Sequence, residues 1–390
     1  MPYIEIIQMT YSVHQSWDRL KVCAVGRSFP PEYFSSIKNT NVRSTVENIA
    51  QETEYDYQKL IKTLENFQVK TIRTDLSYYF PNNTLSGKQF PPPMTPRDHV
   101  AMIGDKFYMP SLVGSKWNNL KGIDWPNSPP ISDREFYNLS SDIKKELESF
   151  GVIDTYGVHD YDHSSLQAIA QLVLSQGNTI IYDQKIDTAM VARVGKDLYV
   201  GTWPHDDINV IQLRMQKLFP EYRCHVIDTR GHLDGSFCVI KPGLIVSTTG
   251  IDLSIFEKHF PGWEVFYLER SPIIENSFAI LKQKNQGKWY VPGQEQNDPF
   301  IDYVETYMSN WLGYVEETTI DVNMLVIDEN NVLCIRENPE MFKVFESHGI
   351  TPHIVDFRHY KFWDGGLHCI TNDLDRGGTQ KNYFPERVNN

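Results

Sequence analysis

The chain has few cysteines, an odd number of them, and no pair at C-x-x-C spacing. Zinc sites and disulfide frameworks need closely spaced or even-numbered cysteines, so both are disfavoured. Such scarcity is typical of a reducing compartment, and we expect a cytoplasmic protein. Four cysteines lie in apolar, strand-like runs and are expected to pack as small core residues, whereas Cys369 follows glycines and a histidine. The full set is Cys23, Cys224, Cys238, Cys334 and Cys369.

Long hydrophobic runs and blocks of basic residues are also absent. No apolar stretch approaches the roughly 18 residues that a membrane span needs. The chain has 50 acidic and 37 basic residues, a net charge of -13, and nucleic-acid affinity depends on clustered cations. We therefore expect neither a membrane nor a nucleic acid as a partner. The start of the chain has neither the basic and apolar regions of a signal peptide nor the arginines of a transit peptide.

The composition is that of a folded chain. Hydrophobic residues make up 41% and aromatic residues 13%, which is too much apolar mass for a disordered protein. Stretches rich in proline, glycine, asparagine and glutamine are expected to be surface loops, because hairpin patterns lie on both sides of them. These stretches are 89–93, 125–131 and 284–300. We expect a single domain over residues 1–390.

One pattern recurs along the chain: an aspartate, an apolar run, a turn and a second apolar run. It begins at Asp18, Asp98, Asp187, Asp234 and Asp321, although only the first limb is clear after Asp18. Turn formers between apolar, β-branched runs predict β-hairpins. From Asp98 onward the spacings are 89, 47 and 87 residues, which approximate two, one and two units of about 45. Spacing does not separate a ring from a stack, and aspartates also occur at strand starts as ordinary turn formers.

Helical patterns fall between the hairpins. Apolar residues recur at helical spacing over 44–67, 164–176 and 339–348, and glycine follows the last two segments. Strand-like runs, VKTIR and TPHIVDF, come after the first and third. The alternation of hairpin, helix and strand predicts an α/β architecture built from repeated ββαβ units.

A thiol, an imidazole and several carboxylates could meet in this architecture. His232 and Asp234 are two apart at a strand entry, so both could border one cavity. Cys369 follows glycines that let a substrate approach the backbone. Asp98 and Asp187 begin two other hairpins in the same register, and they converge if the hairpins surround a common axis.

Together these groups suit substitution at a guanidino carbon. Carboxylates can hold a planar guanidinium, a thiolate can attack its carbon, and a histidine can move the protons. A further carboxylate would orient that histidine and stabilise its charged form. Each motif alone also has a structural explanation. A thiol protease, or a metal bound by His232, Asp234 and another acid, are alternatives from the same residues.

Several of these segments resemble one known family. TPRDHV, KIDTAMVARVGKDLYVG, RGHLDGSFCVIKPGLIVS and DGGLHCITNDLDRGGTQ are similar to motifs of the glycine (arginine:glycine) amidinotransferases. That family is part of the guanidino-group-modifying superfamily, which also contains the arginine deiminases. The resemblance implies a pseudo-fivefold, five-bladed α/β propeller of ββαβ modules around a central active site.

The resemblance also implies roles for individual residues. Cys369 would be the nucleophile, His232 the general acid and base, and Asp187 the partner of His232, while Asp98 and Asp234 would hold the guanidinium. The implied reaction moves an amidino group from L-arginine, or a related guanidine, to an amine acceptor, without a metal or organic cofactor. A deiminase, in which water resolves the same intermediate, is the alternative enzyme, and a non-catalytic binding propeller is the alternative of another class. A homodimer is left open.

The departures from the family pattern fall on substrate recognition. Ile251 stands where the family usually has an arginine that binds the donor's α-carboxylate, and Glu316 and Glu317 replace small hydroxyl residues. Acids repel a carboxylate and favour a cation. We therefore hypothesise that the donor or the acceptor lacks the usual α-carboxylate contact, with the two glutamates as substrate-binding residues. Lysines from a shifted loop are the alternative source of such a contact: Lys282, Lys284 and Lys288.

Overall fold

The computed structural model is described over nine ranges of the chain. They are 10–76, 93–110, 166–183, 186–203, 206–229, 231–268, 289–308, 320–363 and 365–387. The strands in these ranges form five sheets of three strands each. The loop predicted at 125–131 lies outside the described residues, as do parts of those predicted at 89–93 and 284–300.

Every sheet has the same construction. Its central strand pairs antiparallel with one neighbour, which we call the leading strand, and parallel with the other. In the order leading, central, third, the sheets are β15 (Thr371–Gly377), β1 (Arg19–Val25) and β2 (Lys70–Arg73); β3 (Ala101–Ile103), β4 (Lys106–Pro110) and β5 (Thr179–Asp183); β6 (Val191–Val194), β7 (Asp197–Gly201) and β8 (Arg223–Ile227); β9 (Phe237–Lys241), β10 (Leu244–Thr248) and β11 (Glu264–Leu268); β12 (Leu325–Asp328), β13 (Asn331–Cys334) and β14 (Thr351–Ile354).

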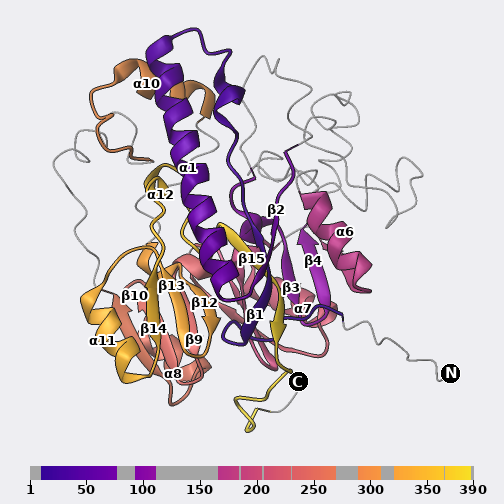
Figure 1. Ribbon diagram of the computed structural model, residues 1–390. Helices are drawn as coiled ribbons and strands as arrows, with labels where there is room; N and C mark the ends of the chain where they lie inside the picture. The colour runs from indigo at the N-terminus through magenta and orange to yellow at the C-terminus, as the bar shows by residue number, and fades with distance from the viewer. Residues whose placement is uncertain are drawn as a thin grey trace.

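A helix joins the central strand of each sheet to the third strand. Parallel neighbours cannot be joined by a tight turn, so the chain needs this crossover. The helices are α1 (Thr40–Asn66), α6 (Gln167–Ser175), α7 (Ile208–Leu218), α8 (Leu253–His259) and α11 (Pro339–Ser347). In Figure 1, α6 and α11 lie on opposite outer sides with strands between them. The predicted ββαβ unit is therefore confirmed, and five of them form the α/β propeller.

Shorter elements complete the described chain. They are η1 (Pro31–Phe34), α2 (Pro96–His99), η5 (Thr188–Met190), η6 (Leu233–Gly235), α10 (Asp298–Tyr303), η7 (Val304–Met308), η8 (Ile320–Val322) and α12 (Tyr360–Trp363). None of the helices in the described ranges combines the length and the apolar character needed to cross a membrane.

The first predicted helix lacks the first turn of the observed one. The helix predicted from 44 begins at Thr40, because the side chain of Asn39 accepts hydrogen bonds from the backbone N–H groups of Asn41 and Val42. Asn338 caps α11 in the same way, through the N–H of Met341. The hydrophobic period marks the buried face and not the cap, which explains the missing turn.

The hairpin expected after Asp18 is not formed. β1 is a central strand, and its antiparallel partner is β15, from the other end of the chain. Figure 1 shows the yellow C-terminal strand beside the indigo N-terminal one. Asp18 therefore precedes a central strand, whereas Asp98, Asp187 and Asp234 precede leading strands of opposite direction. Asp18 lies at the opposite end of its sheet, where its side chain accepts a hydrogen bond from Gln15.

The cysteines behave largely as the sequence predicts. Cys23, Cys224 and Cys334 are buried in strands, and Cys238 is half-buried in β9. No disulfide joins any of the five, all of which are among the described residues. Burial raises the pKa of the Cys23, Cys224 and Cys238 thiols to about 12, so these three stay protonated at neutral pH.

Candidate active site

The site lies where the chain enters the five leading strands. Each leading strand follows a short turn: α2 before β3, η5 before β6, η6 before β9, η8 before β12 and the turn at 366–370 before β15. These entry turns touch one another, with η6 in contact with both η5 and η8, and α2 in contact with η5 and β15. Side chains from distant parts of the sequence therefore meet at one end of the propeller.

Asp187 and His232 form an ion pair between two entry turns. Asp187 caps η5 through a hydrogen bond from the backbone N–H of Ala189 at 2.9 Å. Its other carboxylate oxygen lies 3.0 Å from His232 Nε2. Burial alone would lower the pKa of His232, but Asp187, with Asp98 and Asp234 beyond it, raises that pKa well above its usual value. The pair therefore favours the protonated, imidazolium form of His232.

Asp234 lies beside the thiol of Cys369. Cys369 Sγ is 3.5 Å from Asp234 Oδ2, and both residues are buried, with exposed fractions of 5% and 7%. Burial opposes ionisation of Asp234, but a hydrogen bond from His368 and the positive charges of His232 and Arg97 lower the pKa of the carboxyl. Asp234 Oδ1 is buried and has no hydrogen-bond partner among the described residues. An ionised oxygen beside the thiol is thus available to an N–H donor.

Asp98 is the third acid of the site. It belongs to the one-turn helix α2, and its Oδ1 is buried without a partner in the described part of the chain. Burial raises the pKa of Asp98 well above its usual value, and the negative charges of Asp187 and Asp234 add to this while His232 opposes it. The structure therefore brings Asp98, Asp187 and Asp234 into one electrostatic group around His232. A cation entering this group would favour the ionised form of Asp98.

Asn323 holds the segment that carries Cys369, a contact that the sequence alone does not predict. Its Oδ1 accepts the backbone N–H groups of His368 and Cys369, each at 3.0 Å. Its Nδ2 donates to Cys369 Sγ at 3.0 Å and to the carbonyl of Asp234 at 3.2 Å. The one available signal was its place two residues after Asp321, at the entry to a leading strand.

Gly366 makes room for this contact. A Cβ at position 366 would lie 2.6 Å from the Cβ and Oδ1 of Asn323, closer than nonbonded atoms tolerate. Any larger residue would displace the amide that binds Cys369. The second glycine of the GGLHC motif, Gly366, thus makes room for Asn323.

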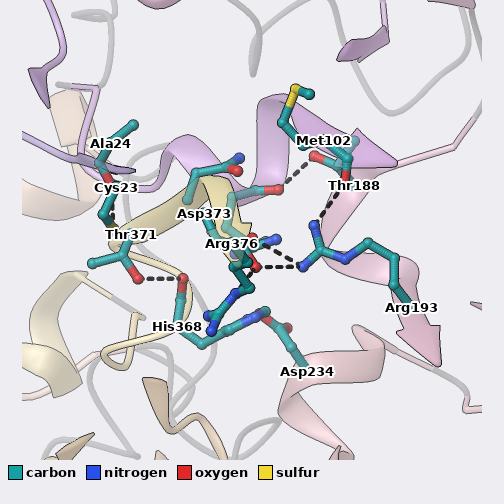
Figure 2. Close-up of polar contacts among 12 residues, drawn as sticks. Cys23, Ala24, Met102, Thr188, Arg193, Asp234, His368, Thr371, Asp373 and Arg376 are labelled. Carbon is teal, nitrogen blue, oxygen red and sulfur yellow. Dashed lines mark hydrogen bonds and ion pairs between the residues drawn. The ribbon is translucent and has the colours of Figure 1, made fainter. Parts of the chain in front are cut away.

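A buried ionic cluster lies next to the site and joins the strands that follow its entry turns. The side chains of Arg97, Arg193 and Arg376 all pair with Asp373, at 2.6, 2.9 and 2.6 Å, and all four residues are at most 3% exposed. Figure 2 shows Arg193 and Arg376 directed toward Asp373, with His368 and Asp234 beside them. The cluster joins α2, β6 and β15, which carry or follow the entry turns.

The backbone of Arg97 ties the same turns together. Its N–H donates to the carbonyl of Cys369 at 3.3 Å, and its carbonyl accepts the Thr188 hydroxyl at 2.5 Å. The segment carrying Asp98 is thereby fixed between those carrying Cys369 and Asp187. The ring of Trp203 contacts the His232 ring edge-on, with 5.5 Å between the centroids.

Asp321 and Ile251, which the sequence also singles out, make structural contacts instead. Asp321 forms a two-point ion pair with Arg336 at 2.6 and 2.8 Å. Of the aspartates that precede leading strands, this one therefore has a structural partner. Ile251 is a core residue, 4% exposed, whose carbonyl accepts the Tyr267 hydroxyl. Glu316 and Glu317 lie outside the described residues. Within the described ranges, no three histidine, cysteine, aspartate or glutamate side chains are grouped as a metal ion would need.

The comparisons with known proteins agree with the fold and the motifs. The chain is 27% identical over 281 residues to the mitochondrial glycine amidinotransferase of Gallus gallus, covering 70% of this chain and 53% of that protein. It is 23% identical over 250 residues to the L-arginine:L-lysine amidinotransferase of Pseudomonas savastanoi pv. phaseolicola, covering 63% of this chain and 56% of that one. The chain therefore spans about half the length of the curated relatives that it matches. No family model matches the chain.

A solved structure shares the whole arrangement. An amidinotransferase from Microseira wollei, of the saxitoxin biosynthetic pathway, superposes with a TM-score of 0.60 at 15% identity, over 96% of this chain and 99% of that one. At this identity the likeness concerns the fold. The amidinotransferase resemblance and the five-bladed propeller, both expected from the sequence, are confirmed.

Proposed function

We propose that this chain, whose sequence relatives and fold are those of amidinotransferases, transfers an amidino group from a guanidine to an amine. L-arginine or a related guanidine is the donor, and Cys369 carries the amidino group between the two half-reactions. The observation that carries the proposal is the meeting of two pairs at the entry turns. Asp187 and His232 are 3.0 Å apart, and the Cys369 thiol lies 3.5 Å from Asp234.

The first half-reaction releases the donor's amine. Asp98 and Asp234 accept N–H groups of the guanidinium. The positive charge of the bound guanidinium favours ionisation of the Cys369 thiol, whose proton passes to solvent, and the thiolate attacks the guanidinium carbon to form a C–S bond. The C–N bond to the leaving amine then breaks, and His232, already protonated by virtue of its ion pair with Asp187, gives that amine a proton. With arginine as donor the product is ornithine.

The second half-reaction regenerates the thiolate. The acceptor amine attacks the amidino carbon, the C–S bond breaks, and the proton lost by the attacking nitrogen returns to His232. Asp187 stabilises the imidazolium in both directions. Asn323 supports the proposal, because its Nδ2 donates to Cys369 Sγ and stabilises the negative charge of the sulfur each time it forms.

The departures in substrate recognition lead to a proposal about the substrates. Ile251 is buried in the core, so it offers a carboxylate no charged contact. We propose that the donor or the acceptor lacks the usual α-carboxylate contact at this position, as agmatine, a polyamine or an amino sugar would. In this proposal, Glu316 and Glu317 hold a cationic group of the substrate. The alternative is a contact with the carboxylate from a lysine of a shifted loop: Lys282, Lys284 or Lys288.

Product analysis separates the candidate reactions. The chain is incubated with arginine or agmatine, with and without a panel of amines. Release of more than one equivalent of ornithine or putrescine per chain only when an amine is present supports transfer, because without an acceptor the first half-reaction stops at the amidino adduct. Citrulline or its decarboxylated analogue plus ammonia, without any amine, supports a deiminase instead. The absence of any product and of any adduct on Cys369 supports a binding propeller.

A further inference from the structure

His368 has no part in the proposed proton transfers, yet it contacts one of the acids of the site. Its Nδ1 lies 2.7 Å from Asp234 Oδ2, and the side chains are 17% and 8% exposed. An ionised carboxylate can only accept hydrogen bonds, so the nitrogen facing it carries the proton. His368 therefore donates to Asp234 through Nδ1–H.

The backbone of His368 is fixed on both sides of this contact. Its N–H donates to Asn323 Oδ1 at 3.0 Å, and its carbonyl accepts the Thr371 hydroxyl at 3.3 Å, a contact visible in Figure 2. The same Asn323 oxygen binds the N–H of Cys369. One amide oxygen thus binds the backbone N–H groups of both His368 and Cys369, the two residues that carry the imidazole and the thiol.

The charge state suits a donor that leaves Asp234 negative. Burial lowers the pKa of His368, and the nearby Arg97 cation lowers it further. Together these two effects outweigh Asp234 and Asp373, which raise it. Arg97 also helps to lower the pKa of Asp234. A neutral imidazole can orient the carboxylate, whereas an imidazolium would cancel its charge and repel a guanidinium.

The two oxygens of Asp234 consequently differ. Oδ2 receives His368 Nδ1 at 2.7 Å and the Cys369 thiol at 3.5 Å. Oδ1 is buried and has no hydrogen-bond partner among the described residues. These contacts restrain rotation of the carboxylate and leave Oδ1 to accept an N–H from a substrate beside the sulfur.

We propose that His368 is a positioning residue, which holds Oδ2 of Asp234 so that Oδ1 accepts a guanidinium N–H next to Cys369. This inference rests on the proposed function, because it takes a guanidinium as the substrate. His368 acts through Asp234 and does not itself touch the reacting atoms. Its loss should weaken the capture of a guanidine while leaving the thiol itself intact.

Two substitutions of His368 test this role. His368→Asn keeps an N–H donor near the place of Nδ1, whereas His368→Leu removes it. The matched control is His348→Leu, which breaks a surface imidazole–carboxylate pair with Glu264, 3.1 Å long. Two rates are measured on Cys369 by mass spectrometry of the intact chain: amidination by arginine, and alkylation by iodoacetamide, which is neutral and needs no carboxylate.

A hydrogen bond to a charged group is worth about 1.5–3 kcal/mol, so His368→Leu should slow amidination roughly ten- to hundredfold, mainly by raising KM for the guanidine. His368→Asn and His348→Leu should stay close to the wild type, and alkylation should change little in all three. Equal slowing of both reactions, or equal losses in His368→Leu and His368→Asn, would show a merely structural role and overturn the inference. So would an unchanged amidination rate in His368→Leu.

A spectroscopic measurement separates this inference from the proposed function. ¹⁵N NMR of histidine-labelled protein at pH 7 should show His368 as the neutral Nδ1–H tautomer, and Asp234→Asn should change its signal. If the wild type forms no adduct with any guanidine, the proposed function fails, and the tautomer still decides whether His368 orients Asp234. An Nε2–H tautomer or an imidazolium at His368 overturns the inference even in an active enzyme.

Discussion

Asn323 Nδ2 lies 3.0 Å from the sulfur of Cys369, and Asn323 Oδ1 accepts the backbone N–H of the same cysteine at 3.0 Å. One buried amide from the entry to β12 thus fixes both the backbone and the side chain of the proposed nucleophile. The leading strand after Cys369 is β15, so the contact spans two sheets.

The substitution Asn323→Ala should reduce the reactivity of Cys369. It removes the donor to the sulfur, and a hydrogen bond to a charged group is worth about 1.5–3 kcal/mol, so the alkylation rate at neutral pH should fall roughly ten- to hundredfold. Iodoacetamide labelling followed by mass spectrometry measures this rate.

The control for this prediction is Asn338→Ala, which removes the cap of α11. It should lower the free energy of unfolding by about 1 kcal/mol and leave the labelling rate unchanged. Equal labelling rates in Asn323→Ala and the wild type would contradict the role of the amide.

The substitution Asp373→Asn should strongly destabilise the protein. Three arginines would remain buried against a neutral side chain, and breaking a buried ion pair in this way costs about 3–5 kcal/mol. Urea unfolding at pH 7 measures the loss. Glu340→Gln, in a pair with Lys343 whose side chains are 74% and 70% exposed, should cost less than about 1 kcal/mol.

The same cluster predicts part of the acid sensitivity. Burial alone would raise the pKa of Asp373. The buried arginines, and Arg193 most of all, nevertheless hold that pKa well below its usual value. Its contribution to stability is therefore complete above the unfolded-state pKa of about 3.9 and is lost as the pH falls toward the lower pKa of the folded state. Asp373→Asn should lose this dependence, and an unchanged acid profile would contradict the assignment.

The substitution Asp187→Asn should shift the pH dependence of amine release. His232 must be protonated to act as the acid, and its raised pKa keeps it so until the pH rises through that value. Without the charge of Asp187 the pKa of His232 falls, so the alkaline limb of the rate profile should move to lower pH. Single-turnover release of ornithine between pH 6 and 10 tests this, and an alkaline limb at the wild-type position would count against the pair.

The local parts of the fold could be predicted from the sequence. Four hairpins, three of the connecting helices and their order follow from hydrophobic period and turn residues, which act within a few residues. The pairing of β1 with β15 could not be predicted, since it joins segments more than 340 residues apart in the chain and depends on closure of the ring. A single domain over 1–390 stays a prediction.

The candidate site was predicted only where its residues carry a recognisable motif. Cys369, His232 and the acids Asp98, Asp187 and Asp234 stand out through their spacing and family resemblance. Asp321 looks the same in the sequence, yet it is paired with Arg336. The roles of Asn323, His368 and Asp373 arise from contacts between different sheets, which no local pattern contains.

The most direct test of the account is mass spectrometry of the intact chain, quenched during turnover with arginine or agmatine. We expect a single amidino adduct that maps to Cys369, disappears on addition of a competent amine, and is absent from Cys369→Ala, which also has no turnover. Turnover at the wild-type rate in Cys369→Ala, or an adduct on another residue, would contradict the central claim.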